Sequence, residues 1–227
     1  MKYFFILLLF TPCMIFAQTT PLSNKKLHIF TLGDSNGSFP FSWPVQLQQA
    51  LPNATVFNIS KSGRTIGFVN NGDSSLNSLL VIDENLKKAD DAANNTPYDF
   101  IILELGTNDA KAVFADRQKE VADNLQHLID KIKGSHYTSI SHAKIVIISP
   151  PPYGTKAEVQ EKYKGGGERI KAMSTIFEKI AQRNHCLFVN GYTTPGLDIN
   201  TMTPDGLHLD AVASRKLIEP VVALITK

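Results

Sequence analysis

The segment HIFTLGDSNGSFPFSW, His28 to Trp43, changes abruptly from an apolar run to small polar residues. The apolar run predicts a buried strand, and the sequence GDSNG follows it directly at 33–37. Gly, Asp, Ser and Asn all favour turns, so this segment alone indicates only a turn at a strand end. The alternative is that the glycines hold the Ser35 hydroxyl at the open end of a sheet, where it can attack a carbonyl. The rest of the chain decides between these two interpretations.

Four further segments resemble this strand. They are short, apolar almost throughout and rich in β-branched or aromatic residues, which is typical of strands covered on both faces. They span residues 54–59, 99–105, 143–149 and 186–190. Helical patterns lie between them at 42–51, 79–93, 116–133 and 167–184, and a closing helix that starts at 209 is expected to be bent or interrupted at Pro220. The alternation predicts a three-layer α/β sandwich, with a parallel sheet of about five strands and helices on both faces.

Residues 1–17 have the pattern of a secretory signal peptide, with Lys2 before an apolar stretch and Ala17 before a polar one. The apolar stretch is short for a transmembrane helix, which needs about 20 apolar residues, and Pro12 interrupts it. The residues before Cys13 lack the small side chain expected beside a lipidated cysteine. We therefore expect cleavage near Ala17 and a secreted or periplasmic protein, without a lipid anchor or stable membrane insertion.

Residues 18–227 are expected to form a single domain, since about 210 residues suit one α/β core. The formal net charge is +2 and no block of like charge occurs, which argues against a nucleic-acid partner. No grouping of His, Cys and Asp has metal-ligand spacing, and no Gly-rich phosphate loop follows the first strand. Neither a metal nor another cofactor is expected, and nothing in the sequence indicates an oligomeric state.

Polar residues follow the strand ends, where open α/β sheets gather their reactive groups. Ser35 ends the first strand, Gly63 lies in the loop after the second, and Asn108 follows the third. Near the C-terminus, Asp205 stands three residues before His208. A nucleophilic serine needs a base, the base needs an orienting acid, and the oxyanion needs hydrogen-bond donors. Each residue also has a plain explanation as a turn, helix cap or solvated loop residue, but their occurrence together in this order favours the catalytic interpretation.

Four sequence blocks resemble those of the SGNH hydrolases, also called the GDSL esterase/lipase superfamily. The blocks are GDS at 33–35, Gly63 after NISKS, LGTND at 105–109 and DGLH at 205–208. The resemblance extends from Phe30 to about Asp210 and is nearest to the small arylesterase-like and carbohydrate-esterase-like members. One departure is Asn36, where the family name expects leucine.

The resemblance implies a flavodoxin-like sheet and a catalytic serine mechanism. It implies Ser35 as the nucleophile, His208 as the base and Asp205 as the orienting acid. It further implies an oxyanion hole formed by the N–H groups of Ser35 and Gly63 and the side-chain amide of Asn108. The expected activity is hydrolysis of short-chain acyl esters through an acyl-enzyme on Ser35, with a small ester or an acetylated glycan as substrate.

Three alternatives were weighed against this interpretation. The spacing of Gly33, Ser35 and Gly37 also fits the nucleophile elbow of α/β-hydrolases, but that fold places several strands before its serine. A non-catalytic glycan-binding module would use aromatic side chains such as Phe39 and Phe41, and the complete catalytic set argues against it. A lysophospholipase or thioesterase-type lipase of the same family is the third alternative.

Two long loops, residues 64–77 and 150–167, are expected to wall the site, because long loops in compact domains are often functional. Arg64, Phe68 and Tyr153 within them are candidates either for substrate contact or for the scaffold. Glu104 is unexpected inside an apolar strand, and the sequence identifies no partner for it.

Overall fold

The computed structural model of the chain describes residues 26–227. The predicted signal peptide, residues 1–17, therefore lies outside the described residues. Within residues 26–227, no helix is both long enough and apolar enough to cross a membrane.

Five strands form one sheet in the order β2-β1-β3-β4-β5, and every neighbouring pair is parallel. Their bounds are β1 His28–Gly33, β2 Thr55–Asn58, β3 Phe100–Glu104, β4 Lys144–Ile148 and β5 Leu187–Val189. This confirms the predicted parallel sheet, and the strand order is that of flavodoxin-like folds. Strand β2 lies on one side of β1, and β3 lies on the other side. The loops that follow β1 and β3 therefore face each other at the carboxyl edge of the sheet.

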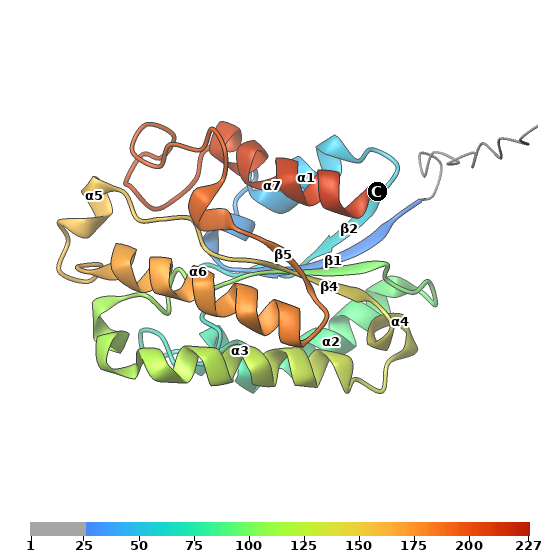
Figure 1. The fold of residues 1–227 in the computed structure, drawn as a ribbon. Coiled ribbons are helices and arrows are strands. Elements are labelled where there is room, and N and C mark those ends of the chain that lie inside the picture. The colour runs from blue at the N-terminus through green and yellow to red at the C-terminus, as the bar shows by residue number, and fades with distance from the viewer. Residues whose placement is uncertain (1–25) are drawn as a thin grey trace, which may run out of the picture.

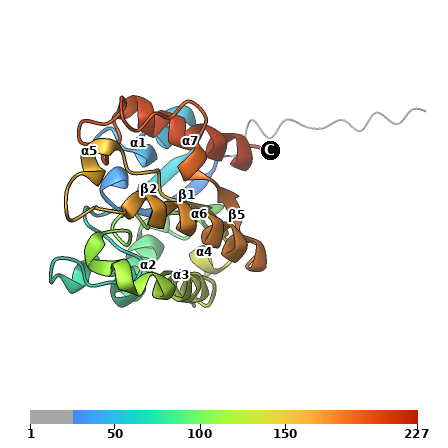
Figure 2. The ribbon, with the colours of Figure 1, turned by 60° about the vertical axis from the view of Figure 1, so that its left-hand side comes forward.

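Helices cover both faces of the sheet, as Figures 1 and 2 show. The long helices are α1 Trp43–Ala50, α2 Ser78–Ala93, α3 Gln118–Lys133, α6 Gly166–Arg183 and α7 Ala211–Ile225, and the short ones are α4 Thr138–Ser141 and α5 Thr155–Glu158. Short 3-10 helices occur at Ser35–Gly37, Ser74–Leu76, Ala112–Arg117 and Gly191–Thr193. Helices α1 and α7 pack on one face, and α2, α3 and α6 pack on the other (Figure 1).

Two apolar cores follow from this arrangement, one on each face of the sheet. Along β3, Ile101 and Leu103 belong to the core under α2, α3 and α6, whereas Ile102 belongs to the core under α1 and α7. Side chains of a strand alternate between faces, so a strand covered on both sides must be apolar at every position. Burying each such side chain contributes about 1.5–3 kcal/mol. The central strands are therefore rigid supports for the loops that follow them.

Helix α7 continues through Pro220 to Ile225, so of the two predicted effects of Pro220, a bend or an interruption, the interruption does not occur. Proline has no N–H and cannot donate to the carbonyl four residues earlier, which ordinarily weakens a helix. Here Leu217 and Val221 on either side of the proline are fully buried against the sheet and α1. Packing of this apolar face outweighs the loss of one backbone hydrogen bond.

Candidate active site

Ser35 lies at the carboxyl end of β1, where the strand turns into a short 3-10 helix. The Asp34 carboxylate accepts a hydrogen bond from the backbone N–H of Asn36 at 2.9 Å and so caps this helix. Gly37 packs so closely that an added Cβ would lie 2.3 Å from Ser60 Oγ. Asp34 and Gly37 together hold the tight turn that presents the Ser35 hydroxyl.

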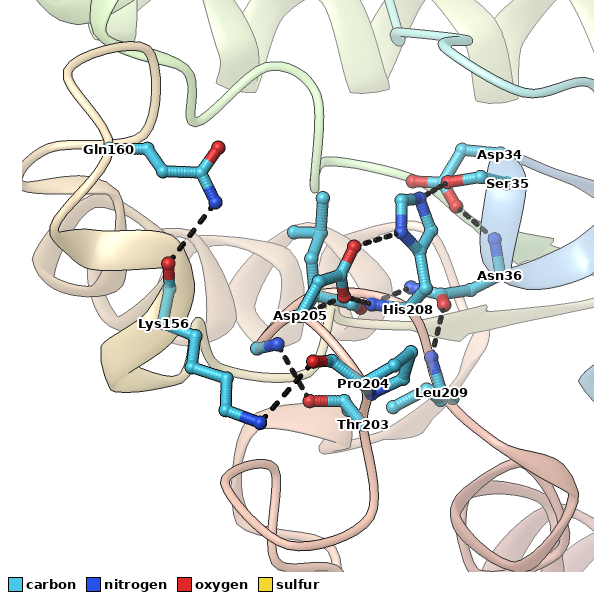
Figure 3. A network of polar contacts seen from close by, with 12 residues as sticks. Asp34, Ser35, Asn36, Lys156, Gln160, Thr203, Pro204, Asp205, His208 and Leu209 are labelled. Atoms are coloured by element: carbon cyan, nitrogen blue, oxygen red, sulfur yellow. Dashed lines mark hydrogen bonds and ion pairs between the residues drawn. The ribbon is translucent and has the colours of Figure 1, made fainter.

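The structure brings Ser35, His208 and Asp205 together, although 173 residues separate the serine from the histidine (Figure 3). His208 Nε2 lies 3.1 Å from Ser35 Oγ, and His208 Nδ1 lies 2.6 Å from Asp205 Oδ2. Asp205 Oδ1 accepts hydrogen bonds from the backbone N–H groups of Leu207 and His208, at 3.0 and 2.8 Å. One carboxylate therefore fixes both the imidazole ring and the backbone of His208.

The charge on Asp205 determines what this arrangement can do. Burial raises the pKa of Asp205, but the hydrogen bonds from His208 and Leu207 outweigh that effect and hold the pKa below its ordinary value. The ionised carboxylate keeps a proton on Nδ1 of His208 and leaves Nε2 able to accept the Ser35 proton. The His208 and Asp205 side chains are 31% and 43% exposed, so the site opens directly to solvent.

Hydrogen-bond donors for an oxyanion lie in the neighbouring loops. Gly63 has a φ of 83°, a left-handed conformation that favours glycine, in the loop after β2. Asn108, in the loop after β3, donates its side-chain N–H to the carbonyl of Arg64 at 3.1 Å. An amide nitrogen carries two hydrogens, so one remains for a bound oxygen. The Asn108–Arg64 contact also ties the loop after β3 to the loop that contains Gly63.

Asp109 is a site residue that the sequence analysis missed. Both of its carboxylate oxygens accept the backbone N–H of Ile66, at 3.0 and 3.1 Å. Burial raises the pKa of Asp109 to about 7, against the opposing effect of backbone hydrogen bonds from Ile66 and Gly67. Asp109 and Asn108 therefore anchor the same loop, and the signal in the sequence was an acidic residue directly after Asn108 at the end of the LGTND block.

The sequence pattern of a known protein family covers all the residues of this site. The GDSL-like Lipase/Acylhydrolase family matches residues 30–216, which is most of the chain. This chain belongs to the GDSL-like lipase/acylhydrolase family. It is thus a GDSL-family esterase or acylhydrolase, as the resemblance of its four sequence blocks predicts. None of the curated proteins compared with it gives a match.

Solved structures share the fold of this GDSL-family protein. A carbohydrate acetylesterase from Sinorhizobium meliloti superposes with a TM-score of 0.73 at 22% identity, over 88% of this chain and 98% of that chain. An aryl esterase of M. smegmatis superposes with a TM-score of 0.70 at 22% identity, over 88% and 98%. An acetyl xylan esterase superposes with a TM-score of 0.64 at 15% identity, over 88% and 100%. At these identities the likeness establishes the fold alone.

The three residues of this GDSL-family protein that were candidates either for substrate contact or for the scaffold are all buried. Phe68 is fully buried and stacks on Phe114 with ring centroids 4.5 Å apart. Arg64 is buried, and its guanidinium donates to a backbone carbonyl at 2.6 Å. The buried Tyr153 donates its hydroxyl to the carbonyl of Thr107 at 2.5 Å. Their side chains support the loops that follow β2, β3 and β4, which agrees with the scaffold alternative.

Other aromatic residues reach the site. The Phe39 ring lies edge-on to the His208 imidazole, with centroids 5.4 Å apart and an interplanar angle of 85°. Phe41 stacks on Phe39 at 5.6 Å and is 42% exposed. Trp43, by contrast, is fully buried and donates its indole N–H to Glu104 at 3.2 Å. Phe39 and Phe41 form what we call the rim pair, and Trp43 belongs to the core.

Glu104 thus has a partner that the sequence did not reveal, and a second carboxyl lies close to it. In the register of β1 and β3, Gly33 stands opposite Glu104, which places Asp34 at the adjacent strand end. Burial raises the pKa of Glu104 well above its ordinary value, the Asp34 charge raises it further, and the Trp43 hydrogen bond only partly opposes this. The Glu104 carboxyl, beneath the turn that carries Ser35, therefore keeps its proton to a higher pH than an ordinary glutamate does.

Glu104→Gln is expected to flatten the pH dependence of stability. A native carboxyl with a raised pKa keeps a proton that the unfolded chain loses above about pH 4.5. Its contribution to stability is therefore full below that pH and is lost progressively as the pH rises towards the folded-state pKa. Glutamine keeps an acceptor for Trp43 and has no such proton. Urea unfolding of both proteins between about pH 5 and about pH 8 measures the difference.

The matched control is Glu84→Gln on α2, because Glu84 is exposed and paired with Lys88. The pKa of Glu84 is lowered by its hydrogen bond to Lys88, so this variant should leave the decline in stability above neutral pH unchanged. An identical pH slope for wild type and Glu104→Gln would show that Glu104 is ionised in the native protein.

Proposed function

We propose that this protein is a serine esterase that forms an acyl-enzyme on Ser35. The observation that carries the proposal is the position of His208, 3.1 Å from Ser35 Oγ and 2.6 Å from the carboxylate of Asp205. His208 Nε2 takes the hydroxyl proton while Ser35 Oγ attacks the ester carbonyl carbon. The negative charge moves to the carbonyl oxygen, where the N–H groups of Ser35, Gly63 and Asn108 stabilise it.

Collapse of this tetrahedral intermediate breaks the bond to the leaving alcohol. His208 gives its proton to the alcohol oxygen, and the acyl group stays on Ser35. Water then enters, His208 removes one of its protons, and the second tetrahedral intermediate releases the carboxylic acid and restores the serine. Asp205 stays ionised throughout and stabilises the transient imidazolium.

We propose in addition that the acyl group is short, with O-acetyl groups on carbohydrate as the substrate class. The solvent-exposed triad supports this, because a methylene contributes about 0.8 kcal/mol only where it becomes buried. The rim pair supports a cyclic alcohol portion, since Phe41 offers a flat exposed surface beside Phe39, which contacts His208. The structural likeness to a carbohydrate acetylesterase and an acetyl xylan esterase points the same way.

The proposed place of action is outside the cytoplasm. Residues 1–17 support it through their signal-peptide pattern, with cleavage expected near Ala17. Polysaccharides with acetyl substituents are too large to enter a cell, so an exported enzyme suits the proposed substrate.

Acyl chain length tests the proposed specificity. The value of kcat/KM for a series of alkyl esters is expected to be highest for acetate and butyrate and to fall beyond about C6. Acetate release from acetylated xylan and acetylated monosaccharides is measured in parallel. A profile that peaks at about C10, or hydrolysis of lysophospholipids without acetate release from any sugar, would favour the lipase alternative.

The rim pair supplies a matched comparison within this experiment. Phe41→Ala should raise KM for an acetylated glycan and leave kcat/KM for ethyl acetate near the wild-type value. Leu80→Ala removes a comparable exposed apolar side chain from α2 and should change neither. Equal effects of Phe41→Ala on both substrates would contradict the stacking role.

A further inference from the structure

The residue after the predicted nucleophile makes two long-range hydrogen bonds. Asn36 Oδ1 accepts the backbone N–H of Leu209 at 2.9 Å, and Asn36 Nδ2 donates to the carbonyl of Leu207 at 3.4 Å. Both partners lie more than 170 residues away in sequence, and Asn36 is only 2% exposed. Figure 3 shows Asn36 between Ser35 and the segment that carries His208.

These two bonds bracket His208, because Leu207 and Leu209 are its immediate neighbours. Asn36 itself is fixed, since its own backbone N–H donates to the Asp34 carboxylate at 2.9 Å. The backbone of the predicted base is thus attached directly to the turn that holds the predicted nucleophile. A one-sided contact would allow the segment to pivot, whereas contacts before and after His208 restrain its Cα position.

Two other backbone anchors of this segment lead elsewhere. The Gly206 carbonyl accepts the N–H of Gly154 at 2.7 Å. The Pro204 carbonyl accepts a hydrogen bond from Lys156 Nζ at 3.3 Å, as Figure 3 shows. Both partners belong to the region between β4 and α6, not to the β1 turn. Loss of the Asn36 bonds would therefore leave the segment attached to the domain but remove the hydrogen bonds between its backbone and the β1 turn.

We propose that Asn36 is a positioning residue that sets the distance between His208 Nε2 and Ser35 Oγ. The inference rests on the proposed function, because it assigns this distance a role in proton transfer. The leucine that the family name expects at this position has no polar side-chain atom and could form neither bond. In this chain a pair of directional hydrogen bonds therefore joins the segment of Ser35 to the segment of His208.

The test is Asn36→Leu, with kcat, KM and thermal stability measured together. Displacement of the base by about 1 Å should lower kcat about 10²-fold, with little change in KM, because substrate contacts are unaltered. The rate constant for phosphonylation of Ser35 should fall by a similar factor. Asn36→Asp keeps the acceptor for the Leu209 N–H but turns an oxygen towards the Leu207 carbonyl and adds a buried carboxyl beside Asp34, so kcat and the labelling rate should also fall.

The matched control is Asn184→Leu at the far end of α6. Asn184 likewise donates and accepts through its amide, to Gln126 and to the Ile180 carbonyl. This variant should lose stability and keep the wild-type kcat. If Asn36→Leu also loses stability but keeps the wild-type kcat and labelling rate, the positioning role is wrong and the bonds are only structural.

Two further outcomes separate this proposal from the proposed function. A wild-type protein that neither hydrolyses esters nor reacts with the phosphonate at Ser35 would overturn the proposed function itself. If Asn36→Leu does not fold, Asn36→Asp decides, since a wild-type kcat and labelling rate in that variant would show that the bond to Leu207 is dispensable for positioning.

Discussion

Ser35→Ala is expected to abolish ester hydrolysis, with kcat lowered about 10⁶-fold. The alanine removes the only atom placed to attack the carbonyl within hydrogen-bonding distance of His208 Nε2 in the described residues. The fold should persist, because the Asp34 carboxylate caps the turn through the backbone N–H of Asn36 and not through the serine hydroxyl. Steady-state kinetics, corrected by titration of active sites, measures the loss.

A covalent phosphonate label provides the independent readout, since mass spectrometry of the digested protein locates the adduct. Ser38→Ala is the matched control, because Ser38 is an exposed serine on the same segment. It should retain both turnover and labelling. Substantial activity in Ser35→Ala, or an adduct on another serine, would refute the proposed mechanism.

Asp205→Asn is expected to lower kcat about 10⁴-fold while largely preserving stability. The asparagine Oδ1 can still accept the backbone N–H groups of Leu207 and His208. Its Nδ2, however, is a donor towards His208 Nδ1, so the neutral imidazole must carry its proton on Nε2. In that tautomer the ring cannot accept the proton of Ser35.

Asp210→Asn is a close control for this substitution. Asp210 lies in the same segment and caps α7 by accepting the N–H of Ala213 at 2.8 Å. Asparagine serves about as well as aspartate at a helix N-cap, so this variant should keep the wild-type kcat. A small effect of Asp205→Asn, comparable with that of Asp210→Asn, would show that Asp205 does not set the tautomer of His208.

The sheet could be predicted because its physical basis is local. Strands such as Ile101–Leu103 are apolar at every position, and only a strand covered on both faces needs that pattern. The carboxyl edge followed from the same reasoning, since parallel strands end on one side. That rule alone predicts Ser35, Gly63 and Asn108 in neighbouring loops.

Side chains at the same edge were harder to assign. Arg64, Phe68 and Tyr153 have the residue types of a binding surface, yet all three are buried. The residue type limits which contacts a side chain can make. Whether that side chain is buried depends on which distant segment packs over it. Phe68 is covered by Phe114, from a different loop, and no local pattern specifies that contact.

The sequence by itself determined which residues could carry ester chemistry, because a serine, a base, an acid and oxyanion donors are distinct residue types in a recognisable order. Only the tertiary structure decided how they are held. Glu104 meets Trp43, and Asn36 brackets His208, through contacts that span 61 and more than 170 residues. Such bonds form only after the strands and helices have packed, since a hydrogen bond requires its two atoms within about 3 Å in a fixed orientation.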